Sequence, residues 1–172
     1  MPDGGAFMMH EFTPGPETSS DFRTTLGRFA TGVTVVTTMT DRGPLGITAN
    51  SFASVSLDPP LVLWCPAKFS KRYTAFVEAS HFSIHVLGTE QEDLSARFAR
   101  DGFDFDGANW TTCDNGSPVL RDCIARFECA THASHEGGDH RIIVGRVLQA
   151  AWREGAPMLF HGGAYGMFTN PG

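Results

Sequence analysis

The chain has 172 residues, of which 41% are hydrophobic and 19% charged, proportions that are ordinary for a soluble globular protein. Its formal net charge is −6 and its Lys and Arg residues form no basic block, so a surface for nucleic acid or for an anionic membrane is not expected. No apolar run approaches the ~20 residues of a membrane span, and a chain of this size is most simply one domain.

The N-terminal part of the chain changes character near residue 19. Residues 1–18 are rich in Gly and Pro and lack an apolar stretch like that of a signal peptide, so we expect a flexible tail ahead of one domain over 19–172. Ser19 or Ser20 is suited to cap a helix that Gly32 would end. Its apolar positions recur at helical spacing: Phe22, Leu26 and Phe29.

The rest of the domain is predicted to be mostly strand. Ser70 is suited to cap a helix over 70–79, and the pattern of 91–100 is also helical. Residues 101–118 mix Gly, Asp and Asn with large aromatic residues, which indicates an ordered excursion rather than a linker. Many strands with few helices favour a barrel-like β domain carrying peripheral helices. The predicted strands are 33–39, 45–50, 61–64, 82–87, 123–134, 140–152 and a short one around Tyr165.

The stretch from Gly46 to Pro60 is the most informative part of the chain. Five of its residues carry short hydroxyl or amide side chains, and they alternate with small or apolar residues. A strand that ends in a hydroxyl-rich turn points many N–H and O–H donors at one place, which suits an anion such as a phosphate. A polar-faced strand followed by an ordinary turn explains the same pattern. The five residues are Thr48, Asn50, Ser51, Ser54 and Ser56.

Known catalytic motifs do not explain the sequence. It has no G-x-G-x-x-G or Walker glycine loop, no serine elbow and no H-E-x-x-H motif. If the protein is an enzyme, a bound cofactor therefore supplies the chemistry. A flavin fits, because its ring needs an apolar slot with a few donors while its phosphate needs N–H and hydroxyl donors.

A series of short motifs runs in order from about residue 22 to 168: 28–37, 48–60, 82–87, 94–99, 138–140 with Gly145, and 161–165. Together they resemble the flavin reductase family, which consists of short NAD(P)H:flavin oxidoreductases with an FMN-binding split-barrel fold. The resemblance implies a mainly β protein, namely a split β-barrel with peripheral helices.

The resemblance also implies where the flavin would bind. It places the cofactor along 49–56, with Ser70 at a helix N-terminus near the phosphate and with charge from Lys71 or Arg72. Ser70 as a helix cap alone is the alternative. The family often carries Asn where this chain has His85, so no flavin contact is assigned there. The expected cofactor-binding residues are Thr48, Ala49, Asn50, Ser51, Phe52, Ser54, Val55, Ser56, Ser70, Lys71, Arg72 and Tyr165.

His140 is the expected catalytic residue. It follows the predicted hairpin turn in the sequence Gly138-Asp139-His140, and the resemblance makes it a residue at the mouth of the flavin site that orients the nicotinamide. The resemblance gives Tyr165, on the last strand, the same task. The alternatives are a surface or structural histidine for His140 and simple packing for Tyr165. Hydride passes directly from nicotinamide C4 to flavin N5, so the protein would only stack the two rings at reacting distance.

The resemblance implies a reductase that transfers a hydride from NAD(P)H to FMN or FAD and supplies reduced flavin to a flavin-dependent monooxygenase. No Arg pair stands out as a clamp for a 2′-phosphate, which favours NADH, whereas FMN and FAD stay open. A homodimer with the flavin near its interface is also expected. The alternative is a non-catalytic flavin-binding or haem-handling split barrel, for which His140, His161 and the cysteines would be the candidate ligands.

The four cysteines indicate a reducing compartment. Without a secretory signal, and in a chain that can build a real core, reduced thiols are expected rather than disulfides, and the cytoplasm is the expected location. Cys129 and His132 would face opposite sides of one strand, so a zinc site there with His135 and His140 is not expected.

Overall fold

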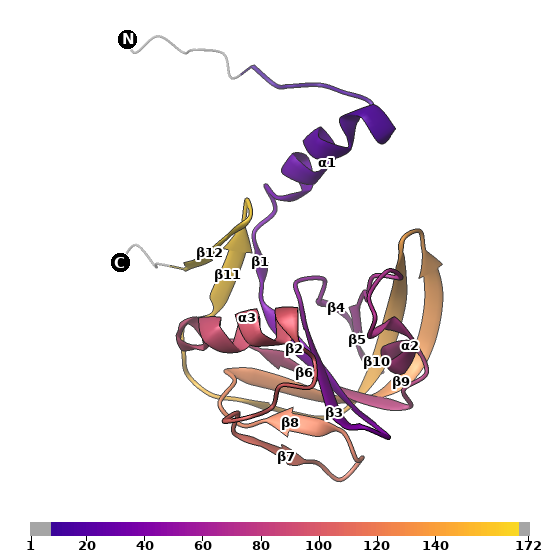
Figure 1. Cartoon of the computed structure of the whole chain (residues 1–172), viewed down its shortest axis with the longest axis vertical. Helices are drawn as coiled ribbons and strands as arrows, with labels where there is room; N and C mark the ends of the chain where they lie inside the picture. The colour runs from indigo at the N-terminus through magenta and orange to yellow at the C-terminus, as the bar shows by residue number, and fades with distance from the viewer. Residues whose placement is uncertain (1–7, 169–172) are drawn as a thin grey trace.

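The computed structural model describes residues 8–168, and one antiparallel sheet of seven strands dominates it (Figure 1). The strands are ordered β3-β2-β6-β9-β10-β5-β4, and the edge strands β3 and β4 do not pair with each other, so the sheet does not close. This arrangement confirms the predicted mainly β fold. The strands are β2 (Thr34–Thr40), β3 (Gly43–Ala49), β4 (Ala53–Leu57), β5 (Pro60–Trp64), β6 (His81–Val86), β9 (Ala125–Gly137) and β10 (His140–Trp152).

Two small sheets lie beside the large one. The first has the order β1-β11-β12, and the second is the hairpin of β7 with β8. The hairpin lies within and just after the predicted excursion, which is therefore ordered as expected. Their strands are β1 (Thr31–Gly32), β11 (Met158–His161), β12 (Ala164–Met167), β7 (Trp110–Thr112) and β8 (Pro118–Leu120).

Helices are short and peripheral. The first, α1, projects away from the sheets and has no buried residue (Figure 1). Among residues 8–168, no helix combines the length and the hydropathy that a membrane span requires. The helical elements are the 3₁₀ turns η1 (Pro16–Thr18) and η2 (Thr89–Gln91) and the α-helices α1 (Ser19–Leu26), α2 (Tyr73–Val77) and α3 (Glu92–Arg100).

The first five residues of β2, an inner strand next to the edge strand β3, are buried, although four of the seven residues of β2 are threonine. Three threonine hydroxyls donate to carbonyl groups: Thr34 to Ala49 at 2.7 Å, Thr37 to Pro118 at 2.6 Å and Thr38 to His81 at 2.9 Å. A buried hydroxyl that keeps a hydrogen bond avoids most of its desolvation cost. The Thr-rich sequence therefore suits an inner strand that is bonded to its surroundings through its side chains.

Two apolar clusters hold the layers together. In the larger one, Trp64 of β5 packs edge-on against Phe76 of α2, with ring centroids 5.0 Å apart, and also contacts Phe82. In the smaller one, Phe98 of α3 packs against Phe105 at 4.8 Å. The smaller cluster explains why the excursion at 101–118 is ordered, because aromatic residues of this excursion pack against α3.

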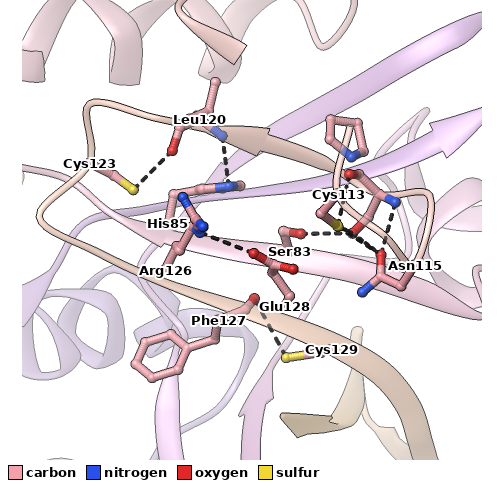
Figure 2. A network of polar contacts seen from close by, with 12 residues as sticks. Ser83, His85, Cys113, Asn115, Leu120, Cys123, Arg126, Phe127, Glu128 and Cys129 are labelled. Atoms are coloured by element: carbon pink, nitrogen blue, oxygen red, sulfur yellow. Dashed lines mark hydrogen bonds and ion pairs between the residues drawn. The ribbon is translucent and has the colours of Figure 1, made fainter. Parts of the chain in front are cut away.

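A buried polar network joins β6 to β8 and β9 (Figure 2). His85 is wholly buried; its Nε2 accepts the Leu120 N–H at 3.0 Å, so its Nδ1 carries the proton and donates to the Val35 carbonyl at 2.9 Å. Burial lowers the pKa of His85 to about 4, with a smaller lowering by the Arg126 cation and an opposing effect of the Val35 hydrogen bond. His85 is therefore a neutral structural residue, consistent with leaving it out of the flavin site.

The N-terminal helix differs from its predicted bounds at both ends. Thr18 rather than a serine is its N-cap, and the helix ends at Leu26, well before Gly32. Gly32 instead belongs to β1, which pairs with β11. The tertiary pairing overrides the helical spacing that continues to Phe29. Of the predicted tail, residues 1–7 lie outside the described residues, so the boundary at 18/19 stays a prediction.

Two other predictions were inaccurate in detail. Ser70 is not a helix N-cap: α2 begins at Tyr73 with Arg72 as its N-cap and ends at Val77. The predicted turn within 46–60 is a short connection followed by the strand β4, and β11 was not predicted at all. A four-residue strand such as β11 has too little alternation to be recognised without its partners.

Candidate functional site

The end of β3 and the β11–β12 hairpin form the two walls of a small apolar slot. This slot has a volume of about 160 Å³ and is lined by Val33, Thr48, Ala49, Asn50, Phe160 and Tyr165. Four of these six residues were predicted to bind the cofactor. The structure therefore brings the motif at 48–50 and the distant Tyr165 to one place.

A larger recess opens beside the slot. It has a volume of about 510 Å³, lies between α1 and the β11–β12 turn, and shares Asn50 and Phe160 with the slot. Thr31 lines this recess, and its hydroxyl is buried without a hydrogen-bond partner among residues 8–168. A buried hydroxyl left unpaired is costly, so its position beside an open recess is one at which a polar ligand atom would be accepted.

Both walls of the slot are tied to α3 through one residue. Ser95 is wholly buried; its Oγ lies 3.0 Å from Tyr165 Oη, and its carbonyl accepts the Thr48 hydroxyl at 2.7 Å. Phe160 packs against Tyr165 with ring centroids 5.6 Å apart. The slot therefore has fixed side chains on both sides.

The residues after the slot enter an edge strand. β4 pairs only with β5, and its ladder has a bulge between Ser54 and Ser56 that leaves Val55 as the extra residue. Ser54 is exposed and Ser56 is half-buried, and neither hydroxyl has a hydrogen-bond partner among residues 8–168, so both are available to a ligand. Phe52, by contrast, stacks on Phe127 at 5.3 Å and belongs to the larger core cluster.

Ser51 has a structural contact of its own. Its Oγ accepts the Cys65 N–H at 2.9 Å and donates to the Cys65 carbonyl at 3.3 Å. The hydroxyl thereby fixes the start of the loop after β5 against the start of β4. Of the three serines in this stretch, Ser51 is therefore the least suited to donate to a phosphate, because its hydroxyl is already hydrogen-bonded to Cys65.

The loop 66–72 carries the three remaining predicted cofactor contacts. Ser70 Oγ accepts the Arg72 N–H at 3.2 Å, and Lys71 is exposed. The Arg72 guanidinium donates to the carbonyl groups of Gly46, Phe98, Ala99 and Arg100, and so fastens the C-terminal end of α3 to β3. Arg72 thus supports the position of α3, whereas the exposed Lys71 side chain has no hydrogen-bond or ion-pair partner among residues 8–168.

His140 lies at the start of β10, next to this loop. Ala67 and His140 form an isolated β-bridge, and Lys68 N–H donates to the Asp139 carbonyl at 2.8 Å. His140 Nδ1 lies 2.7 Å from an Asp139 carboxylate oxygen, and this hydrogen bond lowers the pKa of Asp139. The imidazole is 41% exposed, and its Nε2 has no hydrogen-bond partner among residues 8–168.

The predicted site residues therefore fall into two groups. Thr48, Ala49, Asn50 and Tyr165 line the slot, whereas Ser70, Lys71 and His140 lie around the loop 66–72. The connection at 50–52, with its Ser51–Cys65 hydrogen bonds, links the two groups.

Sequence reasoning missed three residues of the slot region. Val33 was read only as the start of a strand, Phe160 belongs to the unrecognised β11, and Ser95 was part of a motif to which no role was given. The signal available for Phe160 was its place just before the motif at 161–165.

The cysteines and the candidate metal ligands are spread apart. All four cysteines are free, and Cys129 is buried in the core while His132 is exposed on the same strand. Their opposite orientation follows the alternation expected of β9.

Comparison with known proteins gives a consistent result. The model of the flavin reductase like domain matches residues 26–169. FMN reductase (NADH) SmoA of Agrobacterium fabrum is 59% identical over 160 residues, which are 93% of this chain and 92% of that protein. The flavin-dependent monooxygenase reductase subunit HsaB of Rhodococcus jostii is 44% identical over 146 residues, 84% of this chain and 75% of that protein.

A solved structure shares the fold. It is the NADH:FAD oxidoreductase SgcE6 of Streptomyces globisporus in complex with NAD and FAD fragments, with a TM-score of 0.86 and 38% identity, covering 94% of this chain and 99% of that one. The open sheet described above is thus the split barrel that the sequence predicted. On its sequence and on its fold, this chain belongs to the flavin reductase family.

Proposed function

We propose that this protein is an NADH-dependent flavin reductase whose flavin ring lies in the slot between β3 and the β11–β12 hairpin. The observation that carries the proposal is the meeting of Thr48, Ala49 and Asn50 with Phe160 and Tyr165 around one apolar opening. An apolar slot with few polar groups at its edge suits a flat heteroaromatic ring. The unpaired Thr31 hydroxyl beside it adds a polar group ready for a ligand.

Bound flavin, FMN or FAD, supplies the group that accepts the hydride of NADH. The task of the protein is to hold two rings in contact, because hydride transfer needs no acid, base or nucleophile from the chain. Phe160, Tyr165 and Val33 provide the apolar surface, and the backbone at 48–50 provides polar contacts at the rim. This division of labour agrees with the absence of a catalytic motif from the sequence.

The phosphate of the flavin would be bound by the hydroxyl-rich strand. Ser54 and Ser56 on β4 offer hydroxyl groups that are not engaged in the fold, and Lys71 offers an exposed cation. Ser70, Phe52, Val55 and Ser51 would shape this part of the site rather than supply its charge. Arg72 would act through α3, because its guanidinium already bonds four carbonyl groups.

His140 would orient the nicotinamide of NADH. Its free Nε2 and its exposure at the end of the β9–β10 hairpin suit contact with a second, exchanging substrate. Asp139 holds the imidazole through Nδ1, which fixes the ring without closing access to it.

Reduced flavin made by this protein is used by a partner. The relative HsaB is named as the reductase subunit of a flavin-dependent monooxygenase, which supports a monooxygenase as the acceptor here. The relative SmoA is named an FMN reductase (NADH), which supports NADH as the hydride donor and FMN as one acceptor. The four cysteines are free thiols, which agrees with a reducing compartment such as the cytoplasm.

A homodimer would cover apolar side chains that one chain leaves exposed. Phe22, Leu26 and Phe29 are 44%, 59% and 76% exposed in and after α1, and Leu57 at the end of the edge strand β4 is 97% exposed. Apolar side chains gathered on a projecting helix and at a strand edge are typical of an interface. Light scattering at micromolar concentration should give about twice 18.6 kDa, and a monomer would contradict the dimer.

Steady-state oxidation of NADH tests the proposed function. The purified protein should oxidise NADH only when FMN or FAD is added, and NADPH should be the poorer donor. All four combinations of flavin and pyridine nucleotide, measured side by side, rank the substrates. Absence of flavin-dependent NADH oxidation, or a Soret band in the purified protein, would overturn the proposal.

A further inference from the structure

Ser95 is the residue through which α3 contacts both walls of the slot. It is wholly buried, yet it does not line the slot itself. Its carbonyl accepts the Thr48 hydroxyl at 2.7 Å on the β3 side, and its Oγ lies 3.0 Å from Tyr165 Oη on the β12 side. One buried residue therefore connects two segments that come from opposite ends of the chain.

A buried helical serine usually satisfies its hydroxyl within its own helix, by bonding a carbonyl one turn earlier. Ser95 Oγ is instead directed at the phenol of Tyr165. Burying a hydroxyl costs free energy unless it is hydrogen-bonded, so this contact is the one that makes a serine tolerable at a site with no solvent exposure. The same hydrogen bond fixes the position of the Tyr165 side chain.

The helix that carries Ser95 is firmly attached to β3. Gly46 lets Phe98 approach so closely that a Cβ at Gly46 would lie 2.6 Å from the phenyl ring. Arg72 bonds the last three carbonyl groups of α3 and the Gly46 carbonyl. Ser95 is thus presented from a rigid element, which suits a residue that positions others.

The β12 wall has little else to hold it. β12 is the edge strand of its sheet, and all four of its residues are exposed. Within residues 8–168, the Ser95–Tyr165 hydrogen bond is the only one that joins β12 to an element other than β11. The position of Tyr165 at the slot therefore depends on this one contact together with the packing of Phe160.

We propose that Ser95 is a positioning residue of the flavin site, which holds Tyr165 of β12 against the slot while its carbonyl holds Thr48 on the opposite wall. The proposal rests on the function proposed above and adds a residue that touches neither substrate. Without the Ser95 hydroxyl, Tyr165 and β12 would have to be ordered by the flavin itself, and that ordering would weaken binding.

Flavin titration of four proteins tests the proposal: wild type, Ser95→Ala, Tyr165→Phe and the double variant. Each single variant should raise the flavin Kd by roughly 3- to 10-fold, the value of one net hydrogen bond. The double variant should be no worse than the poorer single variant, because both changes delete the same contact.

Ser83→Ala is the matched control. Ser83 is also wholly buried and bonds another hydroxyl, Ser117 Oγ at 2.8 Å, but Ser117, unlike Tyr165, does not line the slot. It should lower the melting temperature without changing the flavin Kd. Tyr165→Phe keeps the test decisive if Ser95→Ala folds poorly, because Tyr165 is 38% exposed and its phenol oxygen is not part of the core.

Two results would overturn the proposal: a wild-type flavin Kd in Tyr165→Phe and Ser95→Ala, or additive losses in the double variant. Hydrogen exchange of the β12 amides provides a readout that does not need flavin. Exchange should be faster in Ser95→Ala than in wild type. If the wild type fails to reduce flavin but the β12 amides exchange faster in Ser95→Ala, the proposed function is wrong and the structural role of the contact is supported. If the wild type is active and the two proteins exchange equally, only the positioning role of Ser95 is refuted.

Discussion

The buried network beneath β8 and the rim of the slot are built from the same kinds of side chain, yet they use their hydrogen-bonding groups differently. In the network, the Leu120 N–H donates to His85 Nε2 (Figure 2). His85 Nδ1 donates to the Val35 carbonyl, and Ser83 bonds Ser117. Around the site, His140 uses one nitrogen and keeps the other free, and Thr31 has a buried hydroxyl without a described partner. Polar groups that are fully paired hold the fold, whereas unpaired ones at an opening are available to a ligand.

The largest effect is expected where the pairing is complete. His85→Leu should lower the free energy of unfolding by about 3–5 kcal/mol, because the Val35 carbonyl and the Leu120 N–H both lose their buried partner. Urea unfolding measures this loss. The flavin Kd of the folded variant should stay at its wild-type value, and a selective loss of flavin binding would break the distinction between the two regions.

Acid should weaken the same region. The pKa of His85 is about 4 in the folded protein and about 6.5 in the unfolded chain, so below pH 6.5 the unfolded chain binds a proton that the folded protein refuses. Stability is therefore full above pH 6.5 and falls by about 3 kcal/mol as the pH reaches 4. Urea unfolding at a series of pH values measures the slope. His85→Gln should flatten it between pH 6.5 and 4, and an unchanged slope would assign the acid sensitivity to other groups.

His140→Ala should act on chemistry rather than on stability. We expect hydride transfer from NADH to slow by as much as ~100-fold when the nicotinamide is misplaced, with nearly unchanged flavin affinity. Stopped-flow reduction of the flavin-saturated variant measures the rate, and a melting curve measures stability. His132→Ala, at an exposed histidine on the neighbouring strand, is the control. A normal rate with a lowered melting temperature would make His140 structural.

The smallest effect is expected at the hydroxyl-rich strand. Ser54→Ala and Ser56→Ala should each weaken flavin binding by about 10-fold, since a hydrogen bond to a charged phosphate is worth at least about 1.5 kcal/mol. Ser51→Ala should cost less affinity but more stability, because Ser51 already bonds Cys65. Ser19→Ala should change neither. Equal affinity in all four proteins would remove β4 from the phosphate site.

The sequence by itself determined the class of the fold and the pieces of the site. A Val- and Thr-rich run predicted β2, the strands β6, β9 and β10 were also predicted, and helical spacing predicted α3 within one residue. The motif at 48–56 was singled out because polar patterning is a local property of the chain, whereas the role of His140 came from the family resemblance. Both assignments stay predictions. The family resemblance rests on such local motifs, which is why it was visible before the fold.

Only the tertiary structure decided how these pieces are used. Pairing of β1 with β11 ended α1 at Leu26, and the same hairpin brought Tyr165 to Thr48. The packing gave His85 its two backbone partners. It also placed the Arg72 guanidinium against the carbonyl groups at the C-terminal end of α3, so Arg72 is engaged within the fold. Contacts between distant segments depend on strand register and on which hydrogen-bonding groups remain unpaired after packing. Neither property can be predicted from the residues of one local segment.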